Sequence, residues 1–162
     1  MIDTEEQWDS TKHSGFTTGE PWMRVVDDYA VWNAAAQVAD DDSVHAHWKR
    51  ILALRKRFND SLVYGDFEML SKSHPAVVAY RRRGGSSHQQ ALVVINFTPQ
   101  ETVWVPPQDG GGASGRGGVA ELVREEFVRL KNYDDVLLPG GGGGEGGLKL
   151  RAFEALMFVG GE

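Results

Sequence analysis

The segment Gln7-Trp8-Asp9, followed by Gly15-Phe16-Thr17-Thr18-Gly19 and then Pro21-Trp22, decides how the rest of this chain is interpreted. It lies within residues 1–28, which combine glycine, proline and charged residues without a sustained helical or strand period. Turn-forming residues without periodicity predict an extended loop.

Beyond this loop, apolar residues recur at helical spacing. Asp28 is a candidate N-cap for a short helix over residues 30–39, because alanine favours helices and Asp is a preferred capping residue. The acidic run 40–42 ends it, and a second helix is expected from Ser43 to Phe58. Ser43 at its start and basic residues at its end suit the helix dipole. Its apolar face consists of Val44, Trp48, Ile51, Leu54 and Phe58.

From Ser61 onward the period changes to that of strands. Short runs rich in β-branched and aromatic residues are separated by turn residues. They cover residues 63–70, 76–82, 91–97, 102–105, 126–132 and 148–159. The first four of these runs predict a β-meander. Packing of two antiparallel layers would bury so many half-apolar strands. The alternation slips between Leu150 and Phe153, which suggests a bulge.

Two glycine-rich stretches, residues 110–118 and 139–147, interrupt this pattern. Glycine loses the most conformational freedom on ordering and offers no side chain to bury, so both stretches are predicted to be flexible hairpin loops. They contain the G-x-G-x-x-G spacing trivially, but neither joins a strand to a capped helix, and phosphate binding is not expected there.

Composition is typical of a globular chain of 162 residues with a net charge of −6 and no cysteine. The negative charge disfavours nucleic acid and anionic membrane surfaces as partners. The absence of cysteine excludes thiolate chemistry and favours a reducing compartment. The first six residues lack the features of a signal peptide, so a cytoplasmic location is expected.

No cofactor or metal is expected either. His45 and His47 stand two residues apart on a predicted helix and therefore point to different faces, unlike metal ligands at four-residue spacing. The acidic run 40–42 is interpreted as a solvated helix cap. Arg81-Arg82-Arg83 is expected to face solvent at a strand end, whereas Trp48 and Trp104 follow the helical and strand periods and are expected in the core.

Taken in order, these segments resemble the C-terminal portion of α-glucosidases of glycoside hydrolase family 13, of the maltase and oligo-1,6-glucosidase type. In that family the opening segment reads roughly R-T-P-M-Q-W-D, then A-G-F-T-x-G, then P-W. The resemblance covers about residues 4–158. Its further matches are Tyr29, Asn33, residues 42–44, 54–56, 63–65 and 93–97, Asn132-Tyr133-Asp134, and residues 150–155.

The resemblance implies an α+β chain with two parts. Residues 1–60 would be the last loop and helix of a (β/α)8 TIM barrel, and residues 61–162 an antiparallel β-sandwich C-terminal domain. The helical part alone cannot close a barrel, which needs eight strands and eight helices in about 250 residues.

The resemblance also implies retaining hydrolysis of terminal α-1,4- or α-1,6-linked glucose in short oligosaccharides such as maltose and isomaltose. That reaction uses two carboxyl groups, which the family carries upstream of the Q-W-D loop. No catalytic residue therefore maps onto this chain, which is expected to lack activity alone and to reach its α-linked oligosaccharides through the missing barrel. Gln7, Trp8, Asp9 and Phe16 are the candidates for the active-site rim.

The family's arginine at the head of R-T-P-M-Q-W-D binds sugar, but its equivalent here is Asp3, and Glu5 and Glu6 replace the proline and methionine. We interpret residues 1–6 as the start of a truncated gene product rather than an evolved loss of the site.

Trp8, Phe16 and Trp22 could stack on sugar rings, but packing of the loop against the barrel and the sandwich is the favoured interpretation.

Two other hypotheses stay open. The chain could be a stand-alone β-sandwich that binds carbohydrate or another partner, although the apolar helix face must then be buried elsewhere. It could also be the tail of a trehalose synthase or sucrose isomerase, which share these segments.

Overall fold

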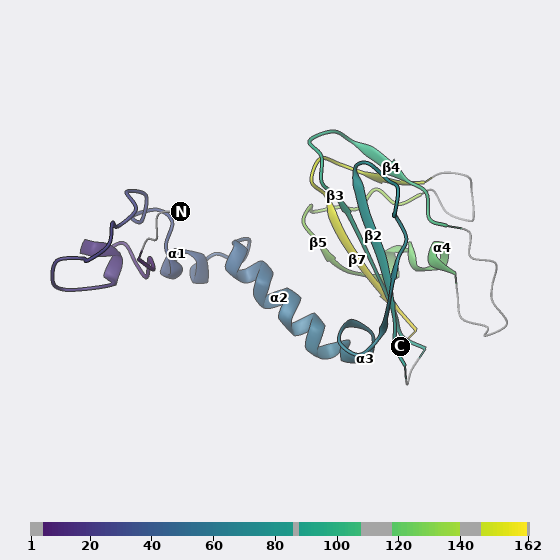
Figure 1. The fold of residues 1–162 in the computed structure, drawn as a ribbon, viewed down its shortest axis with the longest axis horizontal. Coiled ribbons are helices and arrows are strands. Elements are labelled where there is room, and N and C mark those ends of the chain that lie inside the picture. Colours follow the sequence, from purple (N-terminus) through teal and green to yellow (C-terminus); the bar gives the residue numbers. More distant parts are fainter. Residues whose placement is uncertain (1–4, 86–87, 108–117, 140–146, 162) are drawn as a thin grey trace. The chain divides into compact units, whose positions relative to one another are not determined.

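A computed structural model describes residues 5–85, 88–107, 118–139 and 147–161 (Figure 1). The stretches predicted as glycine-rich loops, 110–118 and 139–147, lie outside these residues except at their ends. The chain divides into two compact units, Met1–Ala53 and Leu54–Glu162. No described helix has the length and apolar character needed to cross a membrane.

The first unit contains little regular structure. A single 3-10 turn, η1 (Lys12–Gly15), interrupts the long N-terminal loop that the sequence predicted. Two helices follow, α1 (Ala34–Ala39) and α2 (Val44–Arg57), and the second of these ends in the other unit.

Helix α1 begins later than expected, because Asn33 rather than Asp28 is its N-cap. The Asn33 side chain accepts a hydrogen bond from the Ala36 N–H at 2.9 Å and donates one to the Tyr29 carbonyl at 2.8 Å. The Asp28 carbonyl instead closes a separate turn by accepting the N–H groups of Val31 and Trp32. The prediction of Asp28 as the cap is therefore wrong.

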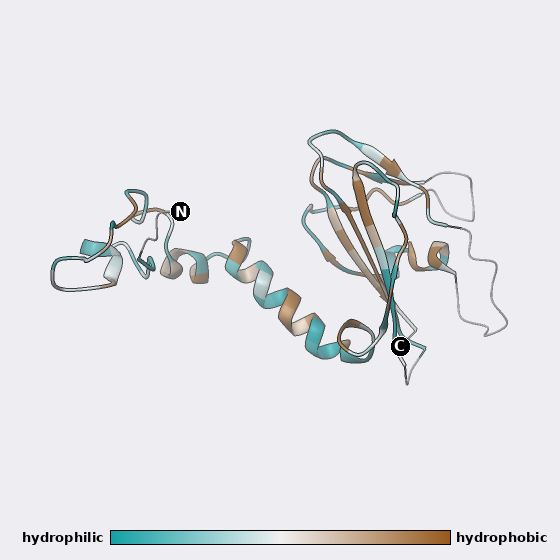
Figure 2. Ribbon diagram, viewed as in Figure 1, coloured by the Kyte–Doolittle hydropathy of each residue, from teal (hydrophilic) through white to brown (hydrophobic). Residues whose placement is uncertain are grey.

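Helix α2 confirms the predicted second helix. Ser43 caps it, since its hydroxyl accepts the Ala46 N–H at 3.1 Å and donates to the Gln37 carbonyl at 2.6 Å. Basic residues occupy the last turn, where the helix dipole favours positive charge. Colouring by hydropathy shows short apolar patches along a largely polar α2, in contrast to the long apolar strands of the second unit (Figure 2).

The second unit consists mainly of two antiparallel sheets. A five-stranded sheet has the order β1-β2-β3-β7-β5, and a two-stranded sheet pairs β4 with β6 (Figure 1). The strands are β1 (Asp66–Met69), β2 (Val77–Arg83), β3 (Gln90–Asn96), β4 (Thr102–Trp104), β5 (Val128–Lys131), β6 (Leu148–Leu150) and β7 (Ala155–Gly160). The short helical elements are α3 (Asn59–Leu62), α4 (Val119–Leu122) and η2 (Glu125–Phe127). The predicted meander holds only for β1 to β3, because β7 returns to pair with β3.

The main core of this unit joins the two sheets. Alternate residues of the central strands pack with residues of β4, β6 and α4. Trp104 is 3% exposed and belongs to this cluster, which confirms its predicted place in the core. The members with no accessible surface are Ala79, Leu92, Val94, Val119, Leu148 and Phe158. Each large apolar side chain buried in this way contributes roughly 1.5–3 kcal/mol to folding.

A second cluster covers the opposite face of β3 and β7. Phe58, which follows α2, packs there with Ala91, Met157 and Val159. The guanidinium carbons of Arg57 and Arg129 lie 4.9 and 5.9 Å from the centroid of the Phe58 ring, within the range of cation–π attraction. This ring anchors the end of α2 to the sheet.

Arg81 does not face solvent as predicted. It is 2% exposed and lies directly opposite Glu68 in the β1–β2 register, where its Nη2 is 2.7 Å from Glu68 Oε2. Arg82, in contrast, donates to the carbonyls of Ser61, Val63 and Gly65. The arginines are thus parts of the structure rather than a solvated run.

The slip in alternation near residue 151 is a corner between sheets, not a bulge. Strand β6 belongs to the small sheet and β7 to the large one, and the chain turns between them at residues 151–154. Phe153 adopts a left-handed conformation there, with φ at 53°. The corner lets apolar side chains on both strands reach the same core.

An ion network holds this corner. The fully buried Glu154 carboxylate accepts hydrogen bonds from the Arg151 backbone N–H, Nε and Nη2, at 2.8, 3.2 and 2.8 Å. Arg151 also reaches Asp135 at 2.6 Å and lies 4.0 Å above the Tyr133 ring. The Tyr133 hydroxyl donates to the Ala152 carbonyl at 2.7 Å. The segment of residues 132–135 therefore contacts the segment of residues 151–154.

Substituting Glu154→Ala should lower the free energy of unfolding by roughly 1.5–3 kcal/mol, because it removes charge-assisted bonds and leaves donors of the partly buried Arg151 without their acceptor. Urea unfolding followed by circular dichroism measures this change. The exposed Glu101→Ala serves as the matched control and should change stability by about 0.5 kcal/mol or less. Equal effects of the two substitutions would contradict the role given to the corner.

The same corner should make stability depend on pH. The hydrogen bond from Arg151, followed by its charge, lowers the pKa of Asp135 from its ordinary value of 3.8. A carboxyl group whose pKa is lower in the folded state than in the unfolded state stabilises the fold at pH values above its unfolded pKa of 3.8. This contribution is lost as the pH falls through the folded pKa. Unfolding measured from pH 5 downward should therefore show a smaller loss of stability in Asp135→Asn than in the unsubstituted chain. An identical pH slope in both proteins would exclude this contribution.

Candidate functional site

The four rim candidates, Gln7, Trp8, Asp9 and Phe16, lie on one closed loop of the first unit. The carbonyls of Gln7 and Trp8 accept the N–H groups of Ala34 and Ala35, at 2.8 and 2.9 Å. The loop therefore supplies partners for the first free N–H groups of α1, which a helix start otherwise leaves unsatisfied. Its backbone position is tied to α1.

The loop closes on itself around Ser14. The N–H groups of Trp8 and Asp9 both donate to the Ser14 carbonyl, at 2.9 and 3.2 Å. His13, Ser14 and Gly15 all have positive φ, a region that side chains other than glycine adopt at a cost. A Cβ on Gly15 would lie 2.6 Å from Asp9 Oδ1, so only glycine fits against this carboxylate. This contact gives a physical reason for the pairing of Asp9 with Gly15-Phe16.

Asp9 serves this loop as a carboxylate acceptor. Its Oδ1 accepts hydrogen bonds from the Thr11 N–H, at 2.8 Å, and from the Thr11 hydroxyl. The bond from the Thr11 side chain, followed by that from its backbone, lowers the pKa of Asp9. The group therefore stays ionised at neutral pH, which suits it to hold the loop or accept from a sugar hydroxyl but not to act as a general acid.

The aromatic rings of the loop lie at the surface. Trp22 is 78% exposed, and Trp8 and Phe16 are also exposed. Trp48, predicted in the core, is 58% exposed as well, so that prediction is wrong for this structure. These rings have no cover among the described residues of the first unit, and their packing against a barrel stays a prediction.

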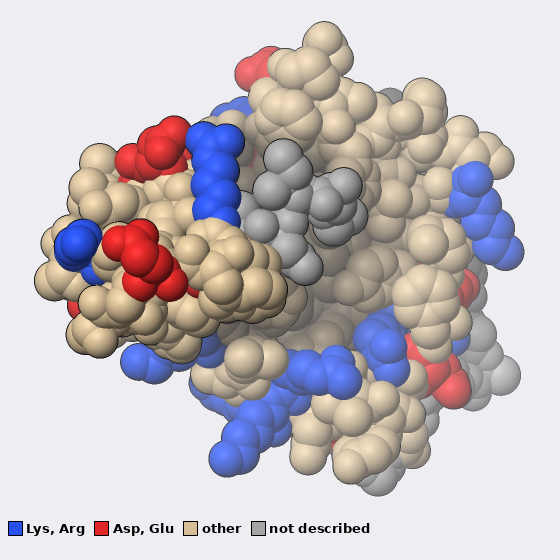
Figure 3. Space-filling view, turned by 60° about the vertical axis from the view of Figure 1, so that its left-hand side comes forward, with Lys and Arg blue, Asp and Glu red and all other residues tan. Residues whose placement is uncertain are grey.

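Burial in the first unit is the reverse of that in a globular domain. Its buried residues in the described part are all polar: Glu5, Ser14, Asn33 and Ser43. Its exposed large apolar residues are Trp8, Phe16, Trp22, Val31, Trp32, Val38, Val44, Trp48 and Leu52. Acidic and basic side chains form separate groups on the face shown in Figure 3, and the large apolar residues named above are open to solvent. A surface of this kind normally belongs to the interior of a larger assembly.

The residues considered above as metal ligands or as a sugar contact do not form a site in the described structure. Within the described ranges, no group of three or more His, Asp or Glu side chains is placed to hold a metal ion. His45 and His47 lie on the first turns of α2, two residues apart, as the sequence indicated. Asp3, at the position of the family's arginine, lies outside the described residues.

Sequence reasoning missed several residues that the structure assigns a role. Asn33 was noticed as a match but not as a cap, although an Asn directly before an alanine run is a recognised capping signal. Arg151 and Glu154 were noticed only as part of a motif. A cleft in the second unit, lined by residues 68–75 and by Trp104, Val105 and Pro107, had no local signal because its walls are far apart in sequence.

Residues 4–65 match the family model described as "Alpha amylase, catalytic domain". An α-glucosidase of Schizosaccharomyces pombe is 44% identical over 97 residues, which cover 59% of this chain and 16% of that protein. An oligo-1,6-glucosidase of Halalkalibacterium halodurans is 32% identical over 158 residues, or 97% of this chain and 25% of that protein. The chain thus spans at most about a quarter of these curated relatives.

A crystal structure of trehalose-6-phosphate hydrolase from Bacillus licheniformis is also similar. It superposes with a TM-score of 0.73 at 27% identity, covering 95% of this chain and 25% of that one. The similarity therefore extends over both units rather than over the matched residues 4–65 alone.

The exposed tryptophans give a direct optical test of the first unit. Four of the five, Trp8, Trp22, Trp32 and Trp48, are more than half exposed, whereas Trp104 is buried. Acrylamide should therefore quench most of the indole fluorescence and leave a resistant fraction. The Trp104→Phe variant should lose that resistant fraction, and Trp22→Phe should retain it. Quenching that reaches only a minority of the fluorescence would contradict the exposure of the first unit.

Proposed function

Residues 4–65 of this chain belong to the α-amylase catalytic-domain family, glycoside hydrolase family 13, and from that premise we propose that the chain is the C-terminal portion of an α-glucosidase. The whole enzyme would release terminal α-1,4- or α-1,6-linked glucose from short oligosaccharides such as maltose and isomaltose. The relatives named α-glucosidase and oligo-1,6-glucosidase support this class of substrate.

One observation carries the proposal: the first unit buries polar residues and exposes its tryptophans. Such a surface needs a partner that covers it. The remainder of a (β/α)8 barrel is the partner that fits, because these residues match a catalytic-domain family whose members are about four times as long as this chain. Helix α2 would then pack on the barrel through Val44 and Trp48, and the second unit would be its β-sandwich domain.

The chemistry would come from the covering part. Retaining hydrolysis uses a carboxylate nucleophile and a carboxyl acid/base about 5–5.5 Å apart across the scissile bond. The rim loop offers Asp9 alone, and its Oδ1 is already engaged by Thr11. The contribution of this chain is therefore positional: the Asp9–Gly15 contact and the bonds to α1 fix where Trp8 and Phe16 stand at the rim.

A fused protein tests the proposal. The segment of the H. halodurans oligo-1,6-glucosidase that precedes its match to this chain would be joined in front of residue Gln7. We expect the fusion to release glucose from maltose or isomaltose, and the present chain alone to release none. Product analysis by chromatography separates hydrolysis from isomerisation of the disaccharide.

Two substitutions on α2 sharpen the test. Trp48→Ser should lower the stability of the fusion by roughly 3–5 kcal/mol, as expected when a large aromatic ring is removed from a core. The variant should therefore lose activity at elevated temperature. The exposed Lys49→Ser, one residue away, should have little effect. Glucose release by the present chain alone, or equal effects of the two substitutions, would contradict the proposed arrangement.

A further inference from the structure

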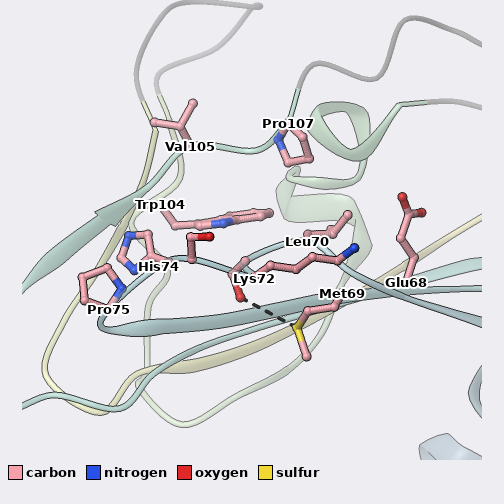
Figure 4. A pocket seen from close by; sticks show the side chains of 11 residues that line it. Glu68, Met69, Leu70, Lys72, His74, Pro75, Trp104, Val105 and Pro107 are labelled. Carbon is pink, nitrogen blue, oxygen red and sulfur yellow. Dashed lines mark hydrogen bonds between the residues drawn. The ribbon is translucent and has the colours of Figure 1, made fainter.

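A cleft of about 640 Å³ opens in the second unit between the β1–β2 hairpin and the end of β4. Its walls are residues 68–75 on one side and Trp104, Val105 and Pro107 on the other (Figure 4). This volume lies within the range of small-ligand sites, which combine apolar walls with a few polar groups that fix orientation.

Polar side chains that can bind a ligand lie at both ends of the cleft. His74 Nδ1 accepts the N–H groups of Ala76 and Val77 at 3.2 and 3.0 Å, so the neutral ring carries its proton on Nε2. Lys72 extends along the cleft from the His74 end toward Glu68 (Figure 4). Neither the Lys72 ammonium nor His74 Nε2 has a hydrogen-bond partner within the described residues.

Glu68 adds an acceptor to these donors. Its Oε2 lies 2.7 and 2.9 Å from the guanidinium nitrogens of Arg81 and Arg83. Its Oε1 makes no hydrogen bond in the described part of the chain. The cleft therefore presents a carboxylate acceptor and an ammonium donor on one side and an imidazole donor on the other.

Apolar surface lies between these polar ends. Pro75, Val105 and Pro107 line the walls, and the Trp104 indole lies across the middle (Figure 4). Because Trp104 is only 3% exposed, a ligand would meet mainly the two prolines and Val105 rather than the open face of the indole. A small rigid apolar surface of this kind matches the C–H face of a pyranose ring.

We propose that this cleft is a binding site for a neutral saccharide of one or two pyranose rings. Vicinal hydroxyls, which both donate and accept, would bridge Lys72 Nζ and Glu68 Oε1, and a hydroxyl at the other end would accept from His74 Nε2. Mixed hydrogen-bond donors and acceptors suit a polyol, whose hydroxyls can both donate and accept. The site lies wholly in the second unit and does not depend on the proposed glucosidase activity.

Titration of the full chain with maltose, followed by amide and indole NMR signals, tests the proposal. The Trp104 indole N–H and the amides of residues 68–75 should shift together, with a dissociation constant in the millimolar range. Lys72→Ala should weaken binding about tenfold, since it removes a charged hydrogen-bond donor. The control Lys149→Ala, an exposed lysine of β6 outside the cleft, should leave the affinity unchanged.

Several results would overturn the proposal. They are the absence of these shifts at tens of millimolar maltose, equal affinity in the two lysine variants, and binding of glucose 6-phosphate where maltose does not bind. Because Lys72 is exposed, unchanged signals from β3 and β7 in Lys72→Ala will show that the fold is intact. A negative result here would leave the fused glucosidase unaffected, so the two proposals fail independently.

Discussion

Apolar surface must be covered by something, and in the first unit of this chain the described residues do not cover it. Nine large apolar side chains are exposed there, while the buried positions hold Glu5, Ser14, Asn33 and Ser43. Hydrophobic burial is the main favourable term in folding, so hydrogen bonds around η1 and α1 are left to define local geometry. The loop is well formed by its own contacts but has no core beneath it. The first unit therefore needs a partner that covers its apolar side chains.

The second unit has what the first lacks. Two apolar clusters cover the two faces of β3 and β7, and the Arg151–Glu154 corner allows one chain to supply strands to both sheets. Glu154 is buried as a charge, which is tolerable only because Arg151 supplies three donors to it. A unit built in this way can hold its shape and still present a cleft at its edge. The first unit holds the residues that match the α-amylase family model, and the second holds the cleft for which we propose a ligand.

Much of this could be predicted from local sequence. The 3.6-residue period located α2 within a residue at each end, and alternation located the strands. The prediction that Arg81 faces solvent was wrong because it rested on the charge of the side chain alone. Arg81 follows Val77 and Ala79 in the alternation of β2 and therefore points inward with them. Its partner Glu68 is set by the β1–β2 register, which sequence alone does not give. Asp28 and Asn33 are both good capping residues, and only the path of the chain distinguishes them.

The remaining features depend on contacts between distant residues. The corner joins residues 132–135 to residues 151–154, and the cleft joins the β1–β2 hairpin to the end of β4. The prediction that Trp48 lies in the core was wrong for a different reason. Its helical spacing correctly identified an apolar face, but the surface that this face would cover is absent from the described residues.

Native-state hydrogen exchange measured by mass spectrometry tests the central claim most directly. Amides open with a free energy that reflects the packing around them. If the first unit has no core of its own, amides of residues 5–39 will exchange far faster than those of β3 and β7, and peptides of α2 will lose protection toward its N-terminal end. Equal protection in the two units would show that the first is stable by itself, and would contradict the account.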